Sequence, residues 1–167
     1  MQPATFSMET FLALSAELTG FTVFDLRGTG EAQAYLDTAT GVVGTAVVAD
    51  LLGVYGKLGG TKDEREKLIR QRILGDPKLG PVTRCLIKLW FTGVWYQLPP
   101  AWIAAYGPLK ANDTFAVRPS SYAEGLLWKT IGANPPGARA PGYGSWAEPP
   151  RIPDPAGDFS VLSLRIV

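Results

Sequence analysis

Hydrophobic residues recur at helical spacing through most of the first 130 residues of this chain. In the segment that follows Ser7, apolar side chains fall on one face, and serine is a favoured N-cap. Gly20 is suited to end a helix because it tolerates a left-handed conformation. The pattern predicts a helix over residues 8–19. Residues 21–30 lack the periodicity, and we expect a connector there, locally extended.

Residues 31–58 have a second helical pattern that glycines interrupt. Each glycine weakens a helix by roughly 1 kcal/mol relative to alanine, so we expect close packing or breaks between short helices. The apolar stretch 42–58 is shorter than the ~20 residues of a membrane span and contains Asp50. We therefore predict no direct membrane span. The four glycines are Gly41, Gly44, Gly53 and Gly56.

A charged segment follows, in which Thr61 and Glu64 have the spacing of a capping box. Oppositely charged residues then alternate four apart, as at Glu66 and Arg70. Charges of alternating sign are typical of a solvated helix face and argue against a nucleic-acid surface. The segment therefore predicts a surface helix.

Residues 81–98 carry the most informative pattern. Pro81 suits a first turn, and the Pro-Pro pair at Pro99 would stop the helix. One face is charged in its first half and aromatic in its second, at Phe91 and Trp95. The second half is thus apolar nearly all round. Such a helix is either central in the fold or covered by another chain, and the pattern leaves both interpretations open.

After a short helical or looped link, residues 120–131 predict a last helix, with Ser120 or Ser121 as its cap and Gly132 as its end. Together these segments predict an all-α domain of about five or six helices. We assign it to residues 1–132.

The composition changes at residue 133, and residues 133–167 are expected to form a long extended arm rich in proline and glycine. Seven of the 14 prolines lie between residues 133 and 157, a composition that favours extended structure without internal hydrogen bonds. The last ten residues alternate apolar and polar side chains, a pattern suited to adding a strand to a neighbour's sheet edge.

The amino-acid composition limits the ligands and cofactor sites that this chain can have. The chain has 167 residues, 46% of them hydrophobic, which suits one domain with a core. Its net charge of +1 gives no indication of nucleic acid or of an acidic membrane surface. It has no histidine and one cysteine, Cys85, so the usual zinc and haem sites cannot be built. Cys85 lies among apolar neighbours and is expected to be a small buried side chain.

The carboxylates are scattered, and none is spaced as an acid–base couple. We therefore predict no catalytic, cofactor-binding or metal-binding residue on this chain, and a role other than catalysis. A cofactor-free enzyme that uses these carboxylates is the least favoured alternative.

Four short motifs, taken in order, resemble a known family. Together they are similar to the small (gamma) subunit of bacterial FAD-dependent sugar and polyol dehydrogenase complexes, the group that includes sorbitol, fructose, gluconate and glucose dehydrogenases. The motifs are METFLALSAELTG at residues 8–20, LWFTG at 89–93, YAEGL at 122–126 and GYGSWAEPP at 142–150.

The resemblance implies a helical accessory protein with no cofactor of its own. In the family, the small subunit binds a large GMC-type catalytic subunit that carries FAD, helps it mature and carries the twin-arginine export signal for both. A multihaem cytochrome c subunit often anchors such a complex at the inner membrane, and haem c or an iron–sulfur cluster lies elsewhere in the complex. The implied location is periplasmic.

The chain departs from the family in three places. No twin-arginine leader or other signal peptide is visible at its start, and residues 138–144 lack the cysteine that some relatives have before the tail tryptophan. Residues 151–167 extend past the expected end.

The resemblance also assigns the aromatic residues of the arm. Tyr143 and Trp146 would be anchors in pockets of the catalytic subunit, each worth ~2 kcal/mol or more when truncated. The alternative is a free-standing helical binding or scaffold protein whose arm folds back as a lid over its own tryptophans. The predicted partner interface comprises Phe91, Trp95, Trp128, Tyr143, Trp146, Pro149 and Pro150.

Overall fold

The computed structural model describes residues 7–109 and 112–138. The chain divides into two units, residues 1–134 and 135–167. In the second unit the described residues form a turn, in which the Ala138 N–H donates to the Pro135 carbonyl oxygen at 3.2 Å. The rest of the predicted arm lies outside the described residues, and with it Tyr143, Trp146, Pro149 and Pro150.

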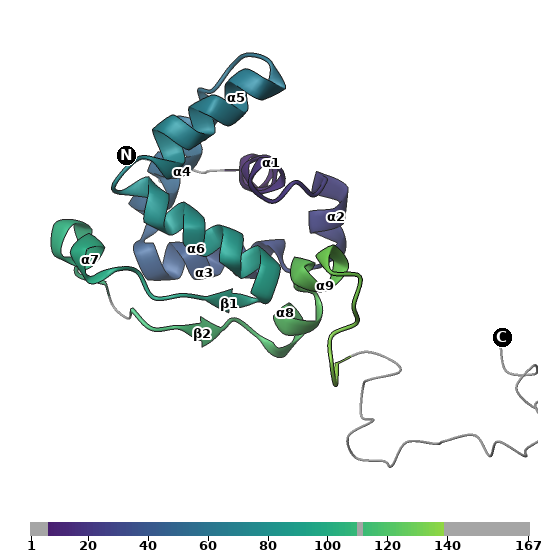
Figure 1. Ribbon diagram of the computed structural model, residues 1–167. Coiled ribbons are helices and arrows are strands. Elements are labelled where there is room, and N and C mark those ends of the chain that lie inside the picture. The colour runs from purple at the N-terminus through teal and green to yellow at the C-terminus, as the bar shows by residue number, and fades with distance from the viewer. Residues whose placement is uncertain (1–6, 110–111, 139–167) are drawn as a thin grey trace, which may run out of the picture. The chain divides into compact units, whose positions relative to one another are not determined.

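The described part of the first unit is predominantly helical (Figure 1), so the prediction of an all-α domain is confirmed. Its helical segments outnumber the five or six expected, because glycines and prolines divide the periodic stretches. The elements are α1 (Met8–Thr19), α2 (Val23–Gly28), α3 (Ala32–Val43), α4 (Thr45–Gly56), α5 (Lys62–Ile69), a π-helical turn η1 (Arg70–Leu74), α6 (Leu79–Thr92), β1 (Val94–Trp95), α7 (Pro100–Tyr106), β2 (Phe115–Ala116), α8 (Pro119–Ala123) and α9 (Leu126–Thr130).

The helix ends that the sequence marks most clearly form as predicted. Helix α1 spans residues 8–19, the Ser7 hydroxyl accepts from a backbone N–H of its first turn, and Gly20 is left-handed with φ 78°. At the start of α5, Thr61 and Glu64 form both hydrogen bonds of a capping box.

The connector expected over residues 21–30 is wrong, because α2 forms there. Thr22 and Asp25 make a second capping box, and Leu26 is fully buried below the short helix. Two side-chain caps and one buried leucine thus hold a helix too short to show periodicity.

The glycine-rich stretch breaks where a left-handed residue is needed. Helices α3 and α4 meet at Gly44, whose φ is 87°, and they are bent by 119° relative to each other. Within the described residues no single helix is long and apolar enough to cross a membrane. Taken together, the bent pair α3–α4 has the length and the apolar composition of a span, and nothing beyond length and composition supports that assignment.

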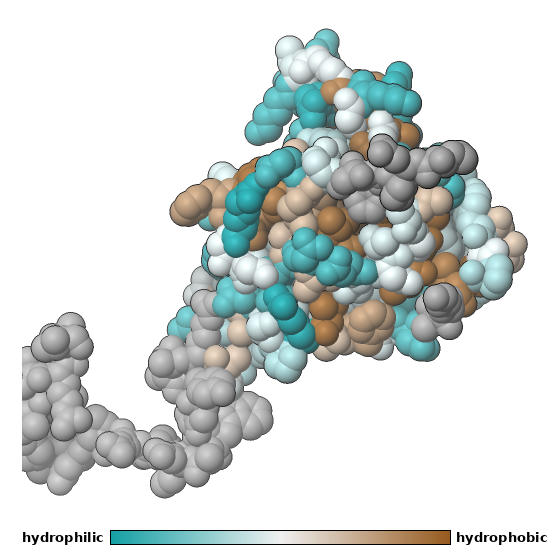
Figure 2. Space-filling model, turned by 180° about the vertical axis from the view of Figure 1, so that it is seen from behind, coloured by the Kyte–Doolittle hydropathy of each residue, from teal (hydrophilic) through white to brown (hydrophobic). Residues whose placement is uncertain are grey.

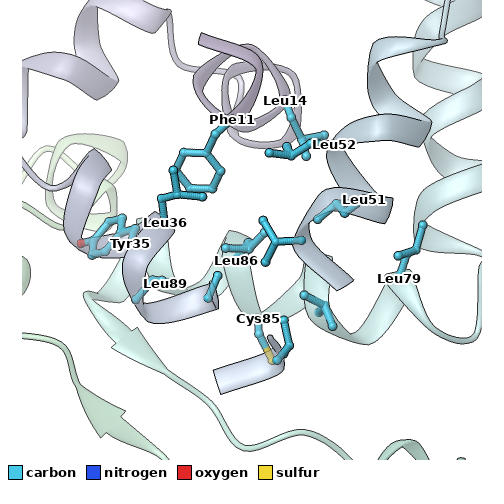
Figure 3. Close-up of a cluster of buried hydrophobic side chains, with 14 of the residues drawn as sticks. Phe11, Leu14, Tyr35, Leu36, Leu51, Leu52, Leu79, Cys85, Leu86 and Leu89 are labelled. Atoms are coloured by element: carbon cyan, nitrogen blue, oxygen red, sulfur yellow. The ribbon is translucent and has the colours of Figure 1, made fainter. Parts of the chain in front are cut away.

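Helix α6 is central in the first unit. Leu79, Cys85, Leu86 and Leu89 from α6 point toward apolar side chains of α1, α3 and α4 (Figure 3). Leu89 and Trp90 are fully buried, so the core of this chain itself covers the second half of the helix that looked apolar all round.

The predicted bounds of this helix are wrong at both ends. It begins at Leu79, where the Asp76 carboxylate accepts from the backbone N–H groups of Lys78 and Leu79 at 2.8 and 2.7 Å. It ends at Gly93, which is left-handed with φ 72°. The chain then continues as β1, which pairs antiparallel with β2.

Candidate partner interface

The candidate interface is the α8–α9 corner, by which we mean residues 119–131. Figure 1 shows both short helices beside the end of α6. The single helix predicted over residues 120–131 does not form, because α8 and α9 are separate and Gly125 lies between them. A Cβ atom on Gly125 would lie 2.7 Å from the carbonyl oxygen of Phe91. Only glycine therefore lets the chain turn this close to α6.

A second glycine brings the two backbones together from the other side. A Cβ atom on Gly93 would lie 2.4 Å from the backbone carbon and oxygen of Ser121. Leu126, the first residue of α9, is fully buried in the core. The corner is therefore fixed by backbone contacts and one buried leucine.

Glu31 fixes the corner through hydrogen bonds. Its side chain is 2% exposed, and one carboxylate oxygen accepts from Arg118 Nε at 2.8 Å and from Ser121 Oγ at 2.6 Å. Arg118 also donates to the carbonyl oxygen of Gly30 at 2.9 Å. The prediction of Ser120 or Ser121 as an N-cap is wrong, since no side chain caps α8 and the Ser121 hydroxyl is buried against Glu31.

These contacts set the protonation state of the network. Burial opposes ionisation of Glu31, but hydrogen bonds from Arg118 and Ser121 outweigh it and hold the pKa of the carboxyl below its ordinary value. Burial raises the pKa of the neighbouring Tyr35 phenol to about 12. The pair of Glu31 and Arg118 is therefore ionised at neutral pH, and Tyr35 is neutral.

The outer side of the corner is apolar. Tyr122 is 41% exposed, Leu127 37% and Ile131 58%. Leu127 and Ile131 are four residues apart and so lie on the same side of the chain. Trp128 is half-buried, packs edge-on against Tyr122 with ring centroids 5.3 Å apart, and donates from Nε1 to the Tyr122 carbonyl oxygen at 2.7 Å. A rigid corner thus presents large apolar side chains to its surroundings.

Exposed apolar side chains occur elsewhere too. Seen from behind, brown hydrophobic residues lie between hydrophilic ones (Figure 2). Phe24 on α2 is 84% exposed. On α7, Tyr106 is 39% exposed and packs against Trp102 with ring centroids 5.5 Å apart. Isolated exposed side chains are common on proteins. The α8–α9 corner is distinguished by carrying three exposed apolar side chains, Tyr122, Leu127 and Ile131, within ten residues.

Three residues of the predicted interface lie within the described part of the chain. Trp128 belongs to the corner. Phe91 is half-buried and packs edge-on against Phe21, with centroids 6.3 Å apart. Trp95 is fully buried in the core, so its side chain is not presented at the surface of the unit. Tyr122, Leu127 and Ile131 were not predicted for the interface, although the spacing of Leu127 and Ile131 was visible in the sequence.

The chemistry of the described residues is limited. Among residues 7–109 and 112–138, no group of three or more His, Cys, Asp or Glu side chains is placed to hold a metal ion. Cys85 is buried as predicted; its thiol donates to the Tyr96 carbonyl oxygen at 3.2 Å, and burial raises its pKa. Such a thiol is a poor nucleophile.

A cavity of about 230 Å³ lies between α1, α5 and α6. The two carboxylates that line it are already engaged: Glu66 pairs with Arg70 at 2.5 Å, and Glu17 accepts from Tyr55 at 2.8 Å. The volume is below the roughly 300–1,000 Å³ of typical ligand pockets. We therefore assign no ligand to it.

Comparison of the chain with protein-family models, with curated proteins and with solved structures found no match.

Proposed function

We propose that this chain is a non-catalytic small subunit of an FAD-dependent, GMC-type sugar or alcohol dehydrogenase complex, in which it stabilises the catalytic flavoprotein and helps its maturation or export. The motif resemblance in the sequence names the partner. The observation that carries the proposal is the apolar α8–α9 corner, whose large side chains are exposed on a support held by Gly93, Gly125 and buried Glu31.

The physical reason is that a preorganised apolar surface loses little conformational entropy on binding. Aromatic and aliphatic side chains that fill a partner's pocket are the usual hot spots of such interfaces. In this proposal FAD and the chemistry belong to the partner, and a multihaem cytochrome c is a further partner. The chain supplies a fixed surface, and substrate is oxidised on the partner's flavin.

The proposal is tested by co-purification from the native host. The full chain, tagged at its N-terminus, is expected to bring down a flavoprotein of GMC size in stoichiometric amount, with a flavin absorption spectrum and sugar-dependent dye reduction. The double substitution Leu127→Asp/Ile131→Asp should abolish co-purification, because each aspartate would have to be desolvated in the interface. Ile131→Asp alone should weaken co-purification, and Phe24→Asp, the same kind of single change at a more exposed site, is its matched control and should leave the complex intact.

The outcomes separate this proposal from the scaffold alternative. A colourless, monomeric chain with a cooperative melt and no large partner would refute the subunit and favour a free-standing scaffold. Loss of the complex in Phe24→Asp as well would show that the α8–α9 corner has no special role. Tyr143→Ala/Trp146→Ala tests the arm residues that the sequence assigns to the same interface.

A further inference from the structure

The β1–β2 pair is the centre of a longer ribbon that leaves one edge open. In Figure 1, β2 lies on the outer side of β1, away from α6. Hydrogen bonds continue the pairing on both sides of the two strands. They run from Val117 N–H to Gly93 O (3.1 Å), from Gln97 N–H to Thr114 Oγ1 (3.1 Å), from Leu98 N–H to Asn112 Oδ1 (2.7 Å) and from Asn112 Nδ2 to Leu98 O (3.0 Å).

The register determines which backbone groups of β2 face outward. Trp95 is opposite Phe115, and the Val117 N–H bonds to Gly93 two residues along. Hydrogen-bonded pairs alternate in an antiparallel ladder, so the backbone groups of Phe115 face β1. The N–H and C=O groups of Thr114 and Ala116 therefore point away from β1.

This edge is accessible, and its protection is limited to the shortness of β2 and to the charge of Asp113. Residues 113–116 are all exposed, and the Phe115 side chain is 39% exposed. The sequence NDTFAV at residues 112–117 contains neither proline nor lysine, the residues that most often block edge pairing. Only an extended polypeptide matches N–H and C=O groups spaced in this way.

We propose that β2 pairs antiparallel with β2 of a second copy of this chain, across a two-fold axis that passes beside Phe115. In this register Thr114 lies opposite Ala116 of the second copy, and Ala116 opposite Thr114 of the second copy. Each of these two pairs is a hydrogen-bonded pair, so four backbone hydrogen bonds form. Phe115 lies opposite Phe115 of the second copy, and the two β-ribbons become one four-stranded sheet.

The position of Phe115 favours a second copy over an unrelated strand. The outward-facing groups lie symmetrically on either side of it, as on any antiparallel edge, so the edge can pair with itself across a two-fold axis. Phe115 occupies the non-hydrogen-bonded position, where facing side chains are closest and aromatic pairs stabilise a sheet. A shift of one residue would break the hydrogen-bond pattern, and a shift of two would separate the phenylalanines. Because the interface is small, the association is weak and depends on concentration.

The test is sedimentation equilibrium of the full chain from ~10 µM to ~1 mM, a range that covers weak dissociation constants. Wild-type protein is expected to form a dimer within this range. Phe115→Lys places like charges opposite each other and should weaken the dimer at least ~10-fold. Phe24→Lys adds the same charge at a more exposed phenylalanine and should leave the dissociation constant unchanged. Ala116→Pro, which removes one outward N–H but keeps Phe115, should also weaken the dimer.

Hydrogen exchange of the wild-type chain gives a readout that needs no substitution. The amides of Thr114 and Ala116 should become protected as concentration rises, whereas the Phe115 amide, already bonded to β1, should not change. A chain that stays monomeric to the highest concentration, or a dimer that weakens equally in Phe24→Lys, would overturn the proposal. A monomer whose binding to a different protein is lost in Ala116→Pro would overturn it too, since the edge would then pair with another chain.

Discussion

Replacing Glu31 with alanine should weaken the attachment of the α8–α9 corner to the rest of the first unit. Glu31 is the acceptor for both Arg118 and Ser121, and its side chain is 2% exposed. The Ser121 hydroxyl is fully buried, so without Glu31 it loses its acceptor at 2.6 Å, and the neighbouring Tyr35 hydroxyl is the group left for it to bond. We expect a lower free energy of unfolding and earlier local opening of the corner.

The magnitude follows from the exposure of the two donors. A buried hydroxyl left without a partner costs about 1–3 kcal/mol. Arg118 is 45% exposed, so water replaces most of its lost interaction, which leaves about 1 kcal/mol or less. Glu31→Ala should therefore lower the free energy of unfolding by roughly 1–4 kcal/mol. Glu31→Gln keeps an acceptor for Ser121 and should lose roughly half as much.

Urea denaturation followed by tryptophan fluorescence measures this difference. Glu9→Ala is the matched control, because Glu9 pairs with Arg27 at 2.5 Å but is 72% exposed. It should cost less than about 1 kcal/mol. If Glu31→Ala and Glu9→Ala were equally mild, the corner would not depend on the buried carboxylate, and the support inferred for the interface would be refuted.

The hydrogen bonds to Glu31 also predict that the free energy of unfolding depends on pH. The folded state keeps Glu31 ionised to lower pH than the unfolded state, whose carboxyl has the ordinary pKa of 4.5. The stabilisation is therefore complete above that value and is lost as the pH falls through the lowered pKa of the folded state. The difference in stability between wild type and Glu31→Gln should shrink below pH 4.5.

Four further predictions concern two glycines, the cysteine and two tyrosines. Gly93→Ala should lower the free energy of unfolding by about 3 kcal/mol or more, because φ is 72° and the backbone of α8 lies in the way. Gly53→Ala, where an added Cβ atom would have nothing within 4 Å, should raise the free energy of unfolding by about 0.5–1 kcal/mol; urea denaturation measures both glycine variants. Cys85 should react with iodoacetamide slowly when folded and fast in urea, because burial raises its pKa. In ultraviolet titration Tyr35 and Tyr55 should ionise near pH 12, because burial raises the pKa of both phenols. The stability that the two neutral phenols contribute should be complete below about pH 10 and should be lost as the pH rises from about 10 to about 12.

Local signals in the sequence predict the helix starts well. Ser7 before α1, and Thr61 with Glu64 before α5, act within three residues of themselves, so no knowledge of the rest of the fold is needed. The capping box at Thr22 and Asp25 is equally local. It was missed because α2 has six residues, too few for hydrophobic periodicity to appear.

The end of α6 could not be predicted from periodicity. Trp95 and Leu98 are both fully buried, so the apolar pattern continues past the point where the helix stops. What stops it is the left-handed Gly93 packed against Ser121, a residue 28 positions later in the chain. Glu31 and Arg118 are 87 residues apart. One sequence without a structure gives no means to pair them, and the apolar corner depends on both contacts.

The contact between Gly93 and Ser121 links the two surfaces proposed for this chain. It ends α6 and so starts β1, and it also fixes the α8–α9 corner against the core. A substitution at Gly93 should therefore disturb both the ribbon and the corner. Substitutions at Ile131 and at Phe115 should each disturb one, because the first side chain is exposed on the corner and the second on the ribbon edge. Co-purification of a flavoprotein should then depend on Ile131 and not on Phe115, and self-association should show the reverse dependence.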